Sequence, residues 1–195
     1  VKIELTGWSP FIPGDSDSSS LPVLGLEYKI KNTSSEVIEA VYSFHAANIM
    51  SLDKNTSAHV SQIDGGFMLA QPEVENISSS EGSFAAFVND PATKVDCAWF
   101  RGGWFDPLTI LWNNVTNGNA ISRPPHAEGK HGNGGSLYVP FCLNPGEEKI
   151  IRLQFAWHVP NSDISFGNAL SMQGTITDGW KVSRIMSPET DIRQA

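Results

Sequence analysis

Apolar and polar residues alternate along several short stretches of this chain, and this two-residue period constrains the fold more than any other feature. The alternation is clearest over Leu137–Leu143 and Ile151–Val159, which flank a turn at Asn144–Glu147. A period of two is that of a β-strand with one buried face. Runs of the same kind, or short apolar runs, occur at 1–5, 24–30, 37–46, 67–70, 84–88, 94–100 and 108–112. Many short strands with little helical pattern predict an all-β fold, a two-sheet antiparallel β-sandwich with long loops.

The segments between these runs predict how the strands connect. A polar turn of hairpin length, 31–36, separates the runs at 24–30 and 37–46, so we expect these two strands to pair antiparallel. The segment 48–63 has weak periodicity and many Ser, Thr and Asn residues, which is typical of a loop. The Gly-, Asn-, Pro- and His-rich segment 117–135 also predicts a long loop.

A stiff loop over residues 7–22 separates the first two predicted strands. Pro10, Pro13 and Pro22 fix backbone angles there, and Gly14 permits a turn that a Cβ atom would resist. Asp15 and the neighbouring serines are expected to close side-chain hydrogen bonds around this turn. Alternating oxygen-bearing residues at 15–19 resemble a calcium loop only faintly, because the glycine and glutamate of that motif are missing, so a self-bonded turn is the better interpretation.

Composition narrows the classes of partner. The chain has 195 residues, enough for one domain, and a formal net charge of -8, which disfavours nucleic acid and anionic membranes as partners. No apolar run approaches the ~18 residues that span a bilayer, so no transmembrane segment is expected. The compartment stays open, because sequons at Asn32, Asn55, Asn76 and Asn114 are common by chance.

The two cysteines, Cys97 and Cys142, both fall on predicted strands. Buried free thiols are the favoured interpretation, and a single disulfide is the alternative. No cofactor or metal is expected. The five histidines are scattered, and His126 and His131 lack a third ligand at useful spacing.

Four stretches resemble one known family in the same order. They are GWSPFIPGDSDSSSLPV from Gly7, LEYKIKNTSSEVIEAVYSFHAAN from Leu26, CAWFRGGWFDPLTILWNNV from Cys97 and SLYVPFCLNPGEEKIIRLQFAWHVPN from Ser136. Together they resemble the N-terminal domain of glycoside hydrolase family 116, the non-lysosomal glucosylceramidase and β-glucosidase family. The resemblance covers most of the chain up to Asn161.

The resemblance implies a two-domain parent protein, a β-sandwich in front of an (α/α)6 barrel. The barrel would hold the two carboxylates of retaining glycoside hydrolysis, so no catalytic residue is assigned to this chain. We expect residues 1–161 to form an internal part of the sandwich domain, incomplete at both ends relative to the family domain. Residues 162–195 would be an extension or linker, with a helix starting near 188 after Ser187 and Pro188.

Aromatic residues on loops are the candidates for contact with a partner or a sugar. Trp8 and Phe11 lie in the first loop, and Arg101, Trp104 and Phe105 lie between the predicted strands at 94–100 and 108–112. Their favoured role is packing against the barrel, since aromatics and Arg are enriched at interface centres, and stacking on a sugar is the alternative. Trp99, Trp112 and Trp157 follow strands and are expected in the core.

The carboxylates are weaker candidates for a functional site than the loop aromatic residues. Asp15 and Asp106 are expected to cap turns, and Glu27 and Glu39 are expected to point to solvent, so a pair of catalytic acids is a minor alternative.

Three functions follow from these observations. The first is a non-catalytic domain that supports the barrel and shapes the rim of its cleft. The second is an independent carbohydrate-binding module that binds a β-glucoside, and the third is a small enzyme. An aromatic platform in line on one sheet face would favour the module.

Overall fold

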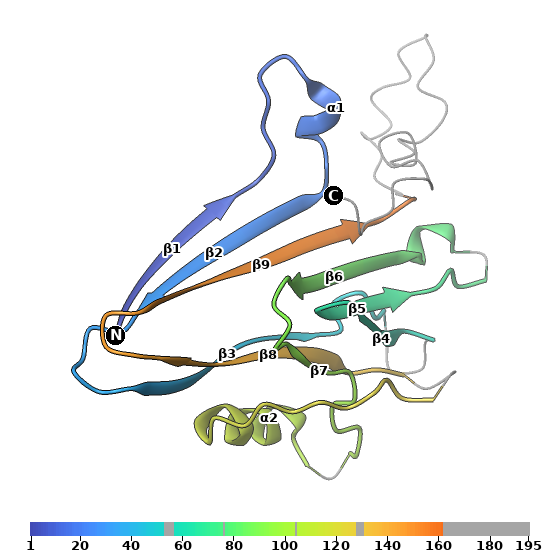
Figure 1. The fold of residues 1–195 in the computed structure, drawn as a ribbon. Helices are drawn as coiled ribbons and strands as arrows, with labels where there is room; N and C mark the ends of the chain where they lie inside the picture. Colours follow the sequence, from blue (N-terminus) through green and yellow to red (C-terminus); the bar gives the residue numbers. More distant parts are fainter. Residues whose placement is uncertain (53–56, 76, 104, 128–130, 162–195) are drawn as a thin grey trace.

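The chain forms two antiparallel sheets that face each other (Figure 1). The computed structural model describes residues 1–161 except 53–56, 76, 104 and 128–130. The larger sheet has the order β1 (Lys2–Trp8), β2 (Val23–Lys31), β9 (Glu148–His158), β6 (Gly82–Val88), β5 (Gly66–Gln71) and β4 (His59–Ile63). The smaller sheet has the order β3 (Ile38–Ala47), β8 (Gly134–Leu143) and β7 (Lys94–Asp96). The predicted all-β sandwich class is confirmed.

Three short helices accompany the sheets in the part of the chain that the structure describes. They are α1 (Ser16–Ser19), η1 (Ser78–Ser80) and α2 (Pro107–Thr116). The helix predicted to start near residue 188 lies outside the described residues, as does the whole segment 162–195.

The core lies between the two sheets and follows the predicted alternation. Alternate residues of β5, β8 and β9 are buried, among them Phe67, Leu137 and Leu153. Aromatic rings join the two sheets across the core: Phe44 of β3 lies edge-on to Phe155 of β9 at 5.1 Å between ring centroids. Burying large apolar side chains is the main stabilising contribution in such a fold, about 1.5–3 kcal/mol for each of them.

The predicted hairpin between the runs at 24–30 and 37–46 is wrong. β2 pairs with β1 and β9 in the larger sheet, whereas β3 pairs with β8 in the smaller one. The connection 32–37 therefore carries the chain from one sheet to the other. The turn 144–147 does the same between β8 and β9. Each connection is short enough for a hairpin. The two strands that it joins nevertheless lie in opposite sheets, because their apolar faces are then buried against each other.

Hydrogen bonds of Asn32 link these two connections. Its side chain is fully buried, with 0% exposure, and its Nδ2 donates to the carbonyls of Glu36 at 2.7 Å and Leu143 at 3.0 Å. Its backbone N–H donates to Glu147 O, and its backbone O accepts from the Gly146 N–H. Although Asn32 heads a sequon, its amide is therefore occupied inside the fold.

The segment 48–63, predicted as a loop, contains the strand β4. Its partner β5 follows after the two-residue turn Asp64–Gly65, in which Gly65 has φ 64°. An Asp-Gly turn favours a tight hairpin because its residues tolerate positive φ. β4 forms because it pairs with β5, and the weak periodicity of its own sequence could not indicate this.

The strand predicted at 108–112 is also wrong, because these residues lie in α2. Asp106 caps the helix, accepting from the N–H groups of Leu108 at 3.1 Å and Thr109 at 3.2 Å, and Pro107 occupies the first turn. This cap and proline are the signals that favour a helix start. Trp112 is consequently 65% exposed instead of filling the core.

The other core predictions are mixed. Trp99 is buried as predicted, although β7 ends at Asp96 and Trp99 lies beyond it. Trp157, near the end of β9, is 38% exposed, so its predicted core position is wrong. Both cysteines are free thiols, but only Cys97 is buried, while Cys142 is exposed. Cys142 pairs with Glu39 in register and lies on the opposite face of β8 from the core residues Val139 and Leu143.

We expect Asn32→Asp to lower the free energy of unfolding by about 3 kcal/mol. The substitution keeps the size of the side chain but replaces the Nδ2 donor with an acceptor that faces two carbonyls, so buried polar groups lose their partners. Chemical denaturation measures the change. The control is Asn119→Ala, an exposed residue whose amide reaches Asn114 only at 3.5 Å, and it should cost under about 0.5 kcal/mol. Equal stability of Asn32→Asp and wild type would refute the role of Asn32.

Candidate functional site

The loop between β1 and β2 closes on itself through its own polar side chains. The Asp15 carboxylate accepts from the Ser18 N–H at 3.0 Å and the Ser18 hydroxyl at 2.7 Å. Ser19 Oγ accepts from the Ile12 N–H at 2.9 Å and donates to the Ile12 carbonyl. These bonds hold the pKa of Asp15 below its usual value, the contact with the Ser18 side chain being the largest cause. The predicted hydrogen bonds around this turn are confirmed for Asp15 and its serines.

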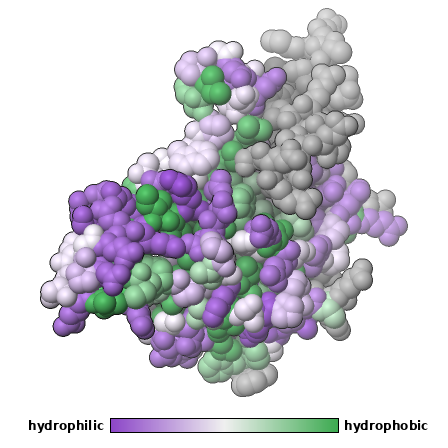
Figure 2. Space-filling model, viewed as in Figure 1, coloured by the Kyte–Doolittle hydropathy of each residue, from purple (hydrophilic) through white to green (hydrophobic). Residues whose placement is uncertain are grey.

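This closed loop exposes apolar side chains. Phe11 is 77% exposed, Ile12 is 51% exposed and Trp8, at the base of the loop, is 48% exposed. We call these three residues the loop surface. Figure 2 shows hydrophobic residues on the part of the molecule that projects at the top of the view. Because the backbone is already ordered, little conformational entropy remains to be lost on docking a partner.

Trp8 lies on a glycine of the neighbouring strand. Gly25 of β2 is its partner in register, and a Cβ atom built on Gly25 would lie 2.3 Å from Trp8 Cε2. The indole ring thus covers the position that a side chain would otherwise fill, an arrangement in which an aromatic residue shields a strand glycine.

The other sequence candidates lie elsewhere. Arg101 is exposed, and its Nη1 donates to His131 O at 3.3 Å. Phe105 is exposed just before the start of α2, and Leu108 and Trp112 are exposed on that helix. We call Phe105, Leu108 and Trp112 the α2 surface. Trp104 lies outside the described residues.

The loop surface and the α2 surface lie on opposite sides of the molecule. In Figure 1 the loop with α1 projects at the top and α2 lies at the bottom, with both sheets between them. The sequence candidates therefore form two separate groups instead of one site. The sequence could not indicate this, because both segments are simply loops next to strands.

A partly buried polar layer, which the sequence analysis missed, lies on the outer face of the smaller sheet. The Nδ1 atom of His45 contacts Ser136 Oγ at 2.9 Å, its Nε2 atom contacts Ser43 Oγ at 2.9 Å, and the Trp99 Nε1–H donates to Ser136 Oγ at 2.8 Å. Ser136 has 0% exposure, so its contact with a histidine gives no accessible nucleophile. Burial lowers the pKa of His45, and the charge of Asp96 opposes this effect.

An ion pair between the buried Asp96 and the half-exposed Arg123 anchors the same layer. Both carboxylate oxygens of Asp96 accept from Arg123, from Nε at 2.9 Å and from Nη2 at 2.6 Å. Arg123 also bridges to β7 through its backbone, so the pair ties the segment after α2 to the smaller sheet. Removing one partner of such a pair leaves a buried charge without compensation.

The other acids considered in the sequence have structural roles as well. Asp106 caps α2, as expected for a loop acid, and Glu27 accepts from Arg152 Nε at 2.7 Å. Glu39 is exposed on β3, in agreement with the expectation for a strand acid. The ordinary roles of these carboxylates account for their positions.

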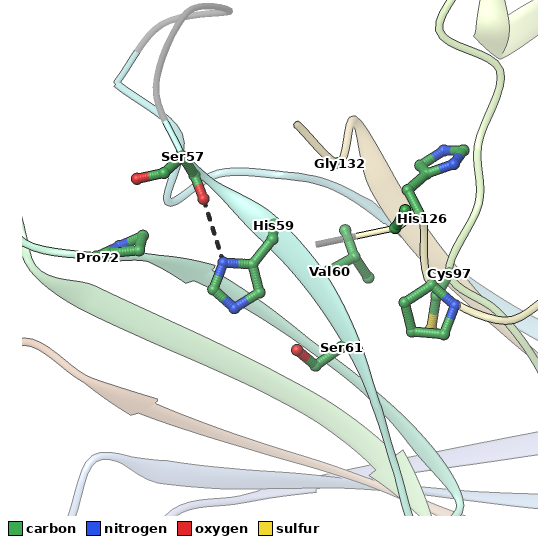
Figure 3. A pocket seen from close by; sticks show the side chains of 10 residues that line it. Ser57, His59, Val60, Ser61, Pro72, Cys97, His126 and Gly132 are labelled. Carbon is green, nitrogen blue, oxygen red and sulfur yellow. Dashed lines mark hydrogen bonds between the residues drawn. The ribbon is translucent and has the colours of Figure 1, made fainter. Parts of the chain in front are cut away.

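A cavity of about 510 Å³ opens beside the edge strand β4 (Figure 3). In the figure, His59 points towards Ser57, to whose carbonyl its Nδ1–H donates at 3.2 Å, while Cys97 and His126 come from the other wall. Burial raises the pKa of the Cys97 thiol to about 12, so it stays protonated and unreactive at neutral pH. Within the described part of the chain, no three His, Cys, Asp or Glu side chains are grouped as a metal site.

The fold and its surfaces define an antiparallel β-sandwich domain with exposed apolar loops. The chain belongs to glycosyl-hydrolase family 116: the model described as "beta-glucosidase 2, glycosyl-hydrolase family 116 N-term" matches residues 1–183. The resemblance found in the sequence is thereby confirmed, and the match runs beyond Asn161. The chain matches no curated protein. No helix among the described residues is long and apolar enough to cross a membrane.

We expect Gly25→Ala to lower the free energy of unfolding by about 1–3 kcal/mol, because the added methyl group displaces the Trp8 indole. The double variant Trp8→Ala, Gly25→Ala should be more stable than the sum of the two single effects predicts, since removing the indole relieves the clash. Denaturation of the four proteins in this cycle measures the coupling. Strictly additive effects would contradict the contact.

The buried His45 makes stability depend on pH. Its pKa is below 6.5 in the folded chain and about 6.5 in the unfolded chain, so the unfolded chain binds the extra proton first. The free energy of unfolding should therefore fall as the pH drops from 7.5 through 6.5 towards the folded pKa. Thermal unfolding between pH 5 and 7.5 checks this, and His45→Gln should flatten the slope. An unchanged slope in that variant would assign the effect to other groups.

Proposed function

We propose that this chain is a non-catalytic domain that docks onto and supports the catalytic domain of a family 116 β-glucosidase. Family membership supports this proposal, because an N-terminal domain of this family implies a catalytic domain in the parent protein. That domain, proposed here to be an (α/α)6 barrel, would supply both carboxylates for retaining hydrolysis of a β-glucoside. The role of this chain is then positioning and stabilisation.

The observation that carries the proposal is the position of the loop surface. The C-terminal end of β9 and the base of this loop lie at the same end of the larger sheet, where the Trp157 N–H donates to Pro22 O at 3.1 Å. The chain therefore leaves β9 beside the base of this loop, on the way to any domain that follows in the parent protein. An ordered loop with exposed aromatic and aliphatic side chains suits the centre of an interface.

The α2 surface is the weaker candidate for this contact. It lies on the far side of both sheets from the end of β9 (Figure 1), so one flat interface would not cover both surfaces. We therefore assign docking to Trp8 and Phe11 in preference to the α2 surface.

The test compares one substitution in two settings. Phe11→Ala should leave the isolated chain as stable as the wild type, because its side chain is exposed there. In the full-length parent protein it should weaken domain docking by about 1–3 kcal/mol, because an aromatic interface anchor is lost. Thermal unfolding of both forms, with hydrolysis of a fluorogenic aryl β-glucoside by the parent, measures the effect.

Trp112→Ala is the matched control, since it removes an exposed aromatic ring from the α2 surface. Trp112→Ala should change the thermal stability of neither the isolated chain nor the parent protein. If Trp112→Ala destabilised the parent protein and Phe11→Ala did not, the α2 surface would be the docking contact instead of the loop surface. Hydrolysis by the 195-residue chain alone would overturn the non-catalytic role.

A further inference from the structure

A second cavity, of about 680 Å³, lies where the turn between β4 and β5 meets the end of β6 and the connection that follows it. Phe87 and Gln154 line it and are partners in register on β6 and β9. The residues on either side of Phe87, Ala86 and Val88, point into the core, so Phe87 itself points outwards. We call this cavity the outer groove.

The hairpin between β4 and β5 shapes one end of the outer groove. Gly65 has φ 64°, and a Cβ atom on it would lie 2.1 Å from Val88 O. Gly66 is the partner of Phe87 in register, and a Cβ atom on it would lie 2.6 Å from Phe87 Cα. The backbone of β6 therefore approaches two glycines closely, and no side chain from Gly66 covers the face of the sheet beside Phe87.

The outer groove continues a row of residues that crosses the sheet. The register joins Gly66 to Phe87, Phe87 to Gln154, Gln154 to Gly25 and Gly25 to Trp8. Two aromatic residues thus stand in line on one sheet face, each beside a glycine, with a planar amide between them. Three strand spacings, about 14 Å in all, separate the strands of Phe87 and Trp8.

The polar lining of the groove suits hydroxyl groups. Asp64 and Asn89 lie at its rim, and Gln154 lies in its floor, which supplies carboxylate and amide groups. The charge of Asp90 is balanced by the Lys149 ammonium. With a net charge of -8 on the chain and Asp64 at the rim, an anionic ligand is disfavoured.

From this arrangement we propose that the outer groove binds a neutral oligosaccharide. A sugar ring would place its flat C–H face on Phe87, while its hydroxyls exchange hydrogen bonds with Gln154, Asn89 and Asp64. The distance to Trp8 is too long for one sugar ring to touch both aromatics, so the ligand is a chain of sugars that follows the row across the sheet. The row ends at Trp8, which also belongs to the loop surface, whereas Phe87, Gln154 and Asn89 lie outside that surface.

Titration of the 195-residue chain with cellotetraose, a neutral β-linked glucose tetrasaccharide, tests the proposal by calorimetry or by NMR shifts. Phe87→Ala should weaken binding at least about tenfold, which corresponds to loss of one stacking contact. Asn89→Ala, an exposed residue beyond the end of β6, should weaken it several-fold without affecting folding. Trp112→Ala is the matched control and should bind like the wild type.

Absence of binding by the wild-type chain would overturn the proposal, as would binding that Phe87→Ala and Asn89→Ala both leave unchanged. Should Phe87→Ala fail to fold, Asn89→Ala decides the outcome. Neither residue belongs to the loop surface, so a negative result here leaves domain docking intact. Conversely, Phe11→Ala tests docking without touching the groove.

Discussion

The hydrogen bonds of Asn32 hold the two sheets together at the end where the chain crosses between them twice. The connections 32–37 and 144–147 are distant in sequence. The buried side chain and the backbone amide of Asn32 form hydrogen bonds that link them. Buried carbonyls that lost this partner would stay unsatisfied, at a cost of about 1–3 kcal/mol each. Beyond this junction, Phe44 of one sheet packs edge-on against Phe155 of the other.

The molecule separates stability from recognition. The core and Ser136 are closed to solvent, while His45 beside Ser136 is half-buried, and the acids Asp96 and Asp106 serve the fold. The features available to partners are ordered elements with exposed aromatic residues: the loop surface, the α2 surface and the outer groove. Each is held by local hydrogen bonds or by strand register.

Much of the fold could be predicted from the sequence. The strong alternation over 137–143 and 151–159 gave β8 and β9, and the serine-rich turn after Asp15 formed the expected bonds. Two segments with weaker sequence patterns were predicted incorrectly. β4 exists because β5 pairs with it, and the apolar run at 108–112 became a helix because Asp106 and Pro107 cap it. The candidate residues were named from the sequence, but their division between two sides of the molecule was not predicted.

The sequence alone determined the family, the all-β class and the loop residues that are exposed, because strand period, turn chemistry and motif order are properties of local sequence. Only the tertiary structure decided which strands share a sheet, since two strands joined by a short turn can pair or can face each other across the core. It also placed Trp8 and Phe87 in one row and set α2 on the far side. Those relations depend on register between distant strands, which burial of both sheet faces fixes and local sequence does not.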